Sequence, residues 1–291
     1  MSILTAPQWL FRRSNDLRQV VDVGLAYVPN IDKALTQLAE MARDEDWGPS
    51  NTILYNYLDY TVHRLIVEDK IVETVDGHGN SVAAFNTGLL TDDVQPIYGF
   101  LNPNPSTLPQ SQPWCFGRWA LSSDFVMSSF SDPPGRARFW HESPAELMFN
   151  VEWGEPEVRL EHIIDHNVGR FPRLLQNLPH LRKHALKDAI DDAVRQVEAD
   201  PHLAAPAYYP KREAVSLLLP LRLIHADVVD LALVIGPFGE RRYAAWTVYK
   251  LDWAYKAARL IKAPSVDWMG PTVVSGDSES EPSGAPEEGT S

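Results

Sequence analysis

Residues 70–89 read KIVETVDGHGNSVAAFNTGL, and this stretch decides how the first half of the chain folds. Lys70–Val75 and Ser81–Leu89 are rich in β-branched and apolar residues, and the turn between them, DGHGN, contains two glycines. Glycine adopts the positive φ angles that tight chain reversals need, and Val, Ile, Thr and Phe favour strands. The pattern therefore predicts a β-hairpin with Asp76–Asn80 as its turn.

Predicted helices and further strands lie on both sides of this hairpin. In residues 31–43 apolar side chains recur every three to four positions, as in a helix with one buried face, and Asn30 can cap its first turn. The turn Pro237–Glu240 separates two apolar runs and predicts a second hairpin. Other helices are expected after Asn51 and at 186–197 and 251–261, and other strands at 95–101, 215–221, 231–235 and 243–249. A mostly antiparallel sheet with flanking helices is an α+β fold.

The two ends of the chain differ in composition from its middle. Residues 271–291 contain five acidic residues and no basic one. Such a segment cannot bury enough apolar surface to offset the entropy lost on ordering, so we predict a disordered acidic C-terminal tail. Residues 1–30 are weakly patterned and are expected to form an irregular lead-in. Residues 31–270 are then expected to form a single α+β domain.

Composition also excludes several classes of protein. Cys115 is the one cysteine among 291 residues, which excludes an internal disulfide framework or a multi-cysteine zinc site and fits a reducing compartment. No stretch approaches the roughly 20 apolar residues that cross a bilayer, so we expect a cytoplasmic protein that does not enter membranes. The net charge of −13 argues against a broad surface for duplex nucleic acid, but it leaves room for a pocket that binds a nucleotide or a short RNA.

Seven stretches, in this order along the chain, together resemble a family defined only as a domain of unknown function, number three-eight-two-five. They are Asn56–Thr61 with Arg64, Glu68 and Lys70; Phe85–Leu89; His162–Asn167 with Arg170–Pro172; Tyr208–Pro210; Leu217–Leu221; Asp230–Val234; and Ala254–Leu260. The resemblance covers about Leu35 to Trp268. Members of this family often stand beside cold-shock-type or other RNA-binding modules, so the resemblance implies work on RNA or nucleotides.

The segment from His162 to Arg170 contains the residue types of a catalytic site. A histidine can exchange protons near neutral pH, an asparagine can orient a substrate, and an arginine can grip a phosphate through its planar fork. We therefore predict His162, Asn167 and Arg170 as catalytic residues. His162 and His166 have the helical spacing of a metal-ligand pair, but no third ligand shares their face, so no metal is predicted, and no cofactor is identified. The structural alternative is a closed Arg-Phe-Pro loop with a hydrogen-bonded histidine.

Substrate-binding residues are expected in two earlier segments. Asn86 and Thr87 precede a glycine at the end of a predicted strand, where backbone N–H groups can bind an anion; the alternative is a β-bulge. Arg64 and Lys70 carry positive charges after a predicted helix and can face a phosphate. The spacing of Arg64 and Glu68 equally fits an ordinary surface ion pair one helical turn apart.

Aromatic and charged residues of the second half complete the predicted site. Asp252, Tyr255 and Arg259 share one face of the last predicted helix, which indicates either a buried hydrogen-bonded network or the wall of a site. Tyr208, Tyr209 and Tyr249 offer rings on which a base can stack, although tyrosine packs as readily into a core. The predicted substrate contacts are Arg64, Lys70, Asn86, Thr87, Tyr209, Tyr255 and Arg259.

Three hypotheses follow for the function. The first, which the sequence favours, is a nucleotide- or RNA-directed enzyme that acts on a phosphate ester, with His162 as general acid and base. In it, Arg170 and Arg64 hold phosphate while Asn86 and Asn167 orient the substrate. The second is a non-catalytic module that binds a nucleotide or a partner protein in the same pocket. The third is a phage-defence or accessory scaffold whose acidic tail engages a basic partner.

Overall fold

The computed structural model describes residues 25–106, 111–139, 144–209, 212 and 214–269. Each half of the chain contributes helices and a mostly antiparallel sheet, which confirms the α+β class. The strands divide into two sheets, and a run of helices lies between the two sets of strands along the chain. The predicted acidic tail, 271–291, lies outside the described residues, as does most of the predicted lead-in.

The first half forms a five-stranded sheet and two helices. Its elements are β1 (Ala26–Tyr27), α1 (Ile31–Met41), α2 (Thr52–Val67), β2 (Val72–Val75), β3 (Ser81–Leu90), β4 (Pro96–Pro103) and β5 (Trp114–Leu121). Asn30 caps α1 as predicted, since its side chain accepts a hydrogen bond from Lys33 N at 3.0 Å. The hairpin predicted from residues 70–89 is the antiparallel pair β2 and β3. The strand order is β1-β5-β4-β3-β2, and β1, which lies within the predicted lead-in, pairs parallel with β5.

The second half places three helices before a four-stranded antiparallel sheet of order β6-β7-β8-β9. Its elements are α3 (Leu160–Asn167), α4 (Arg173–Gln176), α5 (Pro179–Ala199), β6 (Ala205–Tyr209), β7 (Ala214–Leu221), β8 (Leu231–Pro237), β9 (Tyr243–Tyr249) and α6 (Leu251–Ile261). The predicted second hairpin is β8 and β9, and α6 has the predicted bounds. Helix α5 begins at Pro179, earlier than the predicted start at Leu186. Proline favours the first turn of a helix, but the residues before Leu186 do not show the regular spacing of apolar side chains by which a helix is predicted. The one residue that α5 buries in this part is Arg182.

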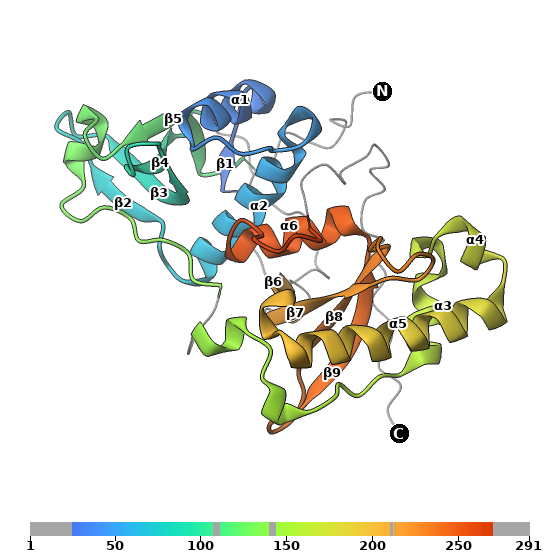
Figure 1. The fold of residues 1–291 in the computed structure, drawn as a ribbon. Helices are drawn as coiled ribbons and strands as arrows, with labels where there is room; N and C mark the ends of the chain where they lie inside the picture. The colour runs from blue at the N-terminus through green and yellow to red at the C-terminus, as the bar shows by residue number, and fades with distance from the viewer. Residues whose placement is uncertain (1–24, 107–110, 140–143, 210–211, 213, 270–291) are drawn as a thin grey trace.

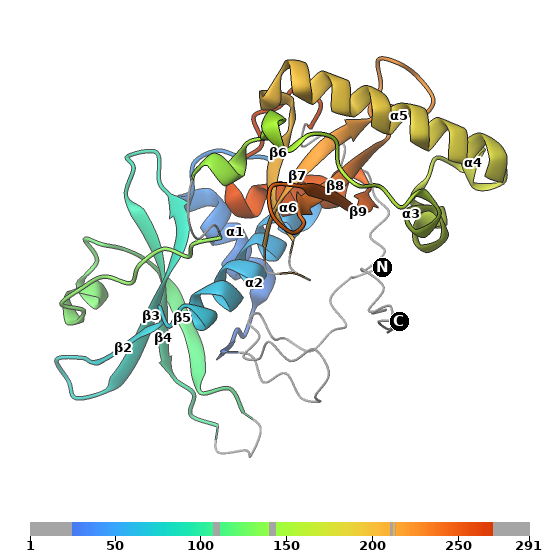
Figure 2. The ribbon, with the colours of Figure 1, turned by 90° about the horizontal axis from the view of Figure 1, so that it is seen from below.

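Helices α2 and α6 lie between the two sheets (Figures 1 and 2). One apolar cluster joins both helices to both sheets, through residues such as Leu58 of α2, Ala258 of α6, Phe85 of β3 and Leu218 of β7. A second cluster fills the space between α3, α5 and the other face of the second sheet. The molecule is therefore layered as sheet, helices, sheet and helices.

The two sheets thus share one core. Buried residues of the first sheet and of the second sheet belong to the same cluster, so neither half buries all of its apolar surface without the other. Among the described helices, none is long and apolar enough to cross a membrane.

Candidate functional site

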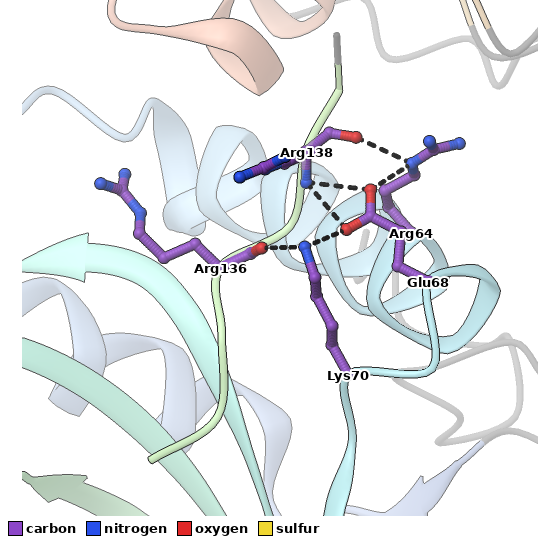
Figure 3. A network of polar contacts seen from close by, with 5 residues as sticks. All are labelled: Arg64, Glu68, Lys70, Arg136 and Arg138. Atoms are coloured by element: carbon purple, nitrogen blue, oxygen red, sulfur yellow. Dashed lines mark hydrogen bonds and ion pairs between the residues drawn. The ribbon is translucent and has the colours of Figure 1, made fainter. Parts of the chain in front are cut away.

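Arg64, Glu68 and Lys70 form a charged network at the end of α2 (Figure 3). The Glu68 carboxylate accepts hydrogen bonds from Arg64 Nε at 2.7 Å and from Lys70 Nζ at 2.5 Å. The ion pair that the helical spacing predicts is therefore present. It is not an ordinary surface pair, because the Arg64 side chain is 5% exposed and that of Glu68 is 12% exposed.

The same network holds residues 136–138 against the end of α2 (Figure 3). Glu68 accepts hydrogen bonds from the backbone N–H of Arg138, with N–O distances of 3.0 and 3.1 Å. Arg64 Nε donates to Arg138 O at 2.9 Å, and Lys70 Nζ donates to Arg136 O at 2.7 Å. Arg64 and Lys70 thus have structural partners, and the exposed side chains here are Arg136 and Arg138, which the sequence analysis did not single out.

These contacts set the acidity of Glu68. Burial alone raises the pKa of its carboxyl, but hydrogen bonds from Lys70, Arg64 and the backbone of Arg138 outweigh it, so the pKa lies below its usual value. The folded protein therefore favours the charged form. The network contributes stability above the unfolded-state pKa of about 4.3, and this contribution is lost as the pH falls through the folded-state pKa.

Asn86, Thr87 and Gly88 form a β-bulge, the second of the two alternatives for this segment. The pairing of β3 with β4 shifts register after Asn86. Asn86 Oδ1 accepts a hydrogen bond from Gly88 N at 2.8 Å, and Thr87 Oγ1 accepts one from Leu89 N at 3.1 Å. Both backbone N–H groups already bind side chains, so the bulge offers no cradle for an anion. Asn86 Nδ2 also donates to Pro134 O at 3.1 Å.

Gly88 lets this bulge approach α2 closely. Its φ angle is +78°, and a Cβ atom at this position would lie 2.5 Å from the hydroxyl of Tyr57. That hydroxyl donates to Thr87 O at 2.9 Å, and Arg136 Nη2 donates to Gly88 O at 3.0 Å. Glycine is required both for the backbone conformation and for the space that Tyr57 occupies.

On α6, Arg259 belongs to a largely buried network, one of the two alternatives for the stripe that it shares with Tyr255 and Asp252, and Tyr255 is itself buried. Arg259 Nε and Nη2 donate to the two carboxylate oxygens of Glu45 at 2.5 and 2.8 Å. The guanidinium carbon lies 4.9 Å from the centre of the Trp47 ring and 4.6 Å from that of Tyr57. Burial lowers the pKa of Arg259, but the Glu45 carboxylate raises it more, so this arginine stays charged.

The structure brings Asn167 and Arg170 together. Asn167 Oδ1 accepts a hydrogen bond from Thr247 Oγ1 at 3.1 Å, and Arg170 Nη1 donates to the same hydroxyl at 3.0 Å. Arg170 Nη1 also donates to Val248 O at 2.7 Å. These bonds attach the end of α3 and the turn after it, Val168–Arg170, to β9.

His162 lies apart from both residues, on the exposed side of α3. Its ring stands beside that of His166, with 4.5 Å between the centroids, as the helical spacing predicts. Asn167 is buried, so the three predicted catalytic side chains do not surround one cavity. Within the described ranges, no group of three His, Cys, Asp or Glu residues could hold a metal ion.

Four aromatic side chains form a continuous row across the second sheet and onto α6. The aromatic row comprises Trp246, Tyr209, Tyr249 and Trp253, and its successive centroid distances are 5.2, 6.2 and 6.2 Å. An arginine lies over each end: Arg212 is 4.8 Å from the Trp246 ring centre, and Arg170 is 4.8 Å from that of Trp253. Tyr249 is buried, Arg212 is exposed, and the other members are half-buried.

The absence of a side chain at Gly236 lets the aromatic row cross the sheet. Tyr209 belongs to β6 and Trp246 to β9, which are the two edge strands. A Cβ atom on Gly236 of β8 would lie 1.9 Å from the Trp246 ring, so the ring rests on this glycine and reaches Tyr209. The sequence analysis singled out Tyr209, Tyr249 and Arg170 but missed Trp246, Trp253 and Arg212. The high density of aromatic residues between 243 and 255 is the signal that could have revealed them.

The fold is thus that of an α+β protein whose two sheets enclose a pair of helices. The family model described as Domain of unknown function (DUF3825) matches residues 38–268. This match covers most of the chain, so the chain belongs to that family. No curated protein and no solved structure matches the chain.

Replacing Glu68 by glutamine tests the charged network. We expect Glu68→Gln to lower the free energy of unfolding near neutral pH by about 1–3 kcal/mol, because hydrogen bonds to a charged group are lost. The difference from the wild type should shrink as the pH falls from the unfolded-state pKa of about 4.3 through the lowered folded-state pKa, because the wild-type carboxylate is then protonated. Urea denaturation near neutral pH and at this low pH measures this.

The exposed Glu73 of β2 provides the control for this experiment. Glu73→Gln should change the free energy of unfolding by less than about 0.5 kcal/mol at either pH. A loss in Glu68→Gln that stays the same at low pH would contradict the electrostatic origin of the stabilisation.

Replacing Gly88 by alanine tests the close approach of the bulge to α2. Gly88→Ala should destabilise the protein by about 2–4 kcal/mol, from left-handed backbone strain and from displacement of Tyr57. The effect should be smaller in a Tyr57→Phe background, because the hydroxyl that the new Cβ meets is gone. Gly77→Ala is the matched control, since no atom lies within 4 Å of a Cβ there. Equal losses at the two glycines would contradict the assignment.

Proposed function

We propose that this protein binds a nucleotide or a short single-stranded RNA on the aromatic row and its two flanking arginines. The observation that supports the proposal is the succession of four rings with Arg212 over one end and Arg170 over the other. It includes Tyr209, which the sequence predicts as a substrate contact, and Arg170, which the sequence predicts to hold phosphate.

The physical basis is the way proteins bind unpaired bases. A base stacks on an aromatic face with little regard for its identity, and each such contact contributes about 1–3 kcal/mol. Arginine both stacks on a ring and attracts a phosphate, and at the end of a row it places charge beside a stacked base. Local cations matter here because the chain as a whole carries a charge of −13, which repels nucleic acid elsewhere.

The arrangement supports binding more than catalysis. A phosphate-ester enzyme needs its acid–base group within hydrogen-bond reach of the bound substrate. His162 is exposed on α3, whereas Asn167 is buried and hydrogen-bonded to Thr247. Of the hypotheses drawn from the sequence, the non-catalytic binding module is therefore the one that we carry forward.

Arg212 is the residue to change first, because it is exposed and its loss should not disturb the core. Arg212→Ala should weaken the binding of a fluorescent oligouridine about 5- to 30-fold, the equivalent of about 1–2 kcal/mol. Fluorescence anisotropy at fixed salt measures the affinity. Arg195→Ala is the control, since Arg195 is exposed on α5, which covers the other face of the same sheet.

Two results would contradict this assignment. One is wild-type protein that binds neither oligouridine nor mononucleotides at micromolar to millimolar concentration. The other is an Arg212→Ala protein that binds as tightly as the Arg195→Ala control. Thermal melting of both variants should match the wild type, which separates lost binding from lost folding.

His162→Ala distinguishes the binding module from the enzyme. We expect this variant to bind oligouridine like the wild type, because His162 is not part of the aromatic row. We also expect neither protein to turn over nucleotides or short RNAs, as followed by chromatography of the products. Turnover by the wild type that His162→Ala abolishes would restore the enzymatic hypothesis.

A further inference from the structure

A cavity of about 280 Å³ lies on the face of the second sheet opposite the aromatic row. It is lined by residues of α5, of the end of β7 and of the connection from β7 to β8. Its apolar floor includes Ala189, Ala193 and Pro220, and its polar wall includes Gln196, Arg222 and His225. This combination of a small apolar floor with a few polar groups is typical of small-molecule sites.

Arg222 contributes the positive charge in the lining of this cavity. Its side chain is half-buried, and Nη1 donates to Gln196 Oε1 at 3.0 Å. Gln196 is neutral, and Arg222 forms no ion pair with any carboxylate in the part of the chain that the structure describes. A half-buried guanidinium that lacks a negative partner is poorly compensated, so an anion in the cavity would stabilise it.

Asp230 holds the loop that carries these residues in place. One oxygen of its carboxylate accepts hydrogen bonds from Leu223 N at 2.7 Å and from Ile224 N at 3.1 Å. Its own backbone N–H donates to Leu221 O at 2.9 Å. The wall containing Arg222 and His225 is therefore organised before any ligand arrives, which reduces the entropy lost on binding.

We propose that this cavity binds a small carboxylate with a short apolar body. The planar fork of Arg222 matches a carboxylate, and the floor of alanine and proline suits a hydrocarbon portion. The volume of about 280 Å³ lies just below the roughly 300–1,000 Å³ of typical ligand sites, which favours a metabolite smaller than a nucleotide. Asp192, which also lines the cavity, is bonded to Arg195, so its charge is compensated by a neighbour.

Butyrate is a suitable probe, with 1-butanol as a probe of the same length that lacks the carboxylate. In the ¹⁵N-labelled full chain, butyrate should shift the amide signals of residues 222–226, and the shifts should saturate in the millimolar range. Equal concentrations of 1-butanol should shift them at least about tenfold less effectively. Arg222→Gln should weaken butyrate binding at least about tenfold, whereas Arg173→Gln, at an exposed arginine of α4, should not.

A second variant guards against a change in folding. Ala226 lines the cavity and is exposed, so Ala226→Trp should obstruct the cavity without altering the core and should also abolish the shifts. The proposal is overturned by shifts that do not saturate, by butanol binding as well as butyrate, or by Arg222→Gln binding like Arg173→Gln. Tighter binding of inorganic phosphate than of butyrate would overturn the carboxylate assignment.

Discussion

The packing of α6 against α2 is the contact on which the rest of this structure depends. The two helices lie between the sheets, and their apolar faces share one core with both of them. Arg259 reinforces this contact: its guanidinium lies over the rings of Trp47 and Tyr57 while Glu45 binds it through both oxygens. The two hydrogen bonds between Arg259 and Glu45 fix both the distance and the orientation of the two side chains. The pair therefore helps to set how α6 packs against the first half of the chain.

Around this centre, charged side chains mainly serve to hold backbone segments in place. Glu68, Arg64 and Lys70 bind residues 136–138, and Arg170 binds β9. Backbone groups outside regular elements need partners when they are buried, and long charged side chains supply them where strands and helices do not. A motif that contains arginine and asparagine can therefore arise from chain closure alone, as the bonds of Asn167 and Arg170 to Thr247 illustrate.

The aromatic row depends on a different constraint, the absence of a side chain at Gly236. A ring from one edge strand can meet a ring from the other edge only if the strands between them leave room. The row therefore joins residues that are distant in sequence and not neighbours in the sheet. Together with its terminal arginines, it is the arrangement on which the proposed binding of stacked bases rests.

Local patterns in the sequence were sufficient for the elements themselves. The hairpin of residues 70–89, the cap at Asn30 and the bounds of α6 follow from turn chemistry, capping and apolar period, all of which act over a few residues. The Arg64–Glu68 pair and the bulge at Asn86–Gly88 were among the predicted alternatives for the same reason. Family membership also followed from the order of short motifs along the chain.

Only the tertiary structure decided which of these residues meet. The sequence does not encode locally that the strands form two sheets, that Arg136 and Arg138 lie beside Glu68, or that Trp246 reaches Tyr209 over Gly236. Helical spacing alone could not decide whether His162 or Asn167 points inward, because both faces of α3 carry polar residues. Ile163 and Ile164 belong to the apolar cluster between α3, α5 and the second sheet, and their packing leaves Asn167 buried and His162 exposed. Long-range packing selects among faces that local periodicity leaves equivalent, and that selection determines which side chains remain available to a ligand.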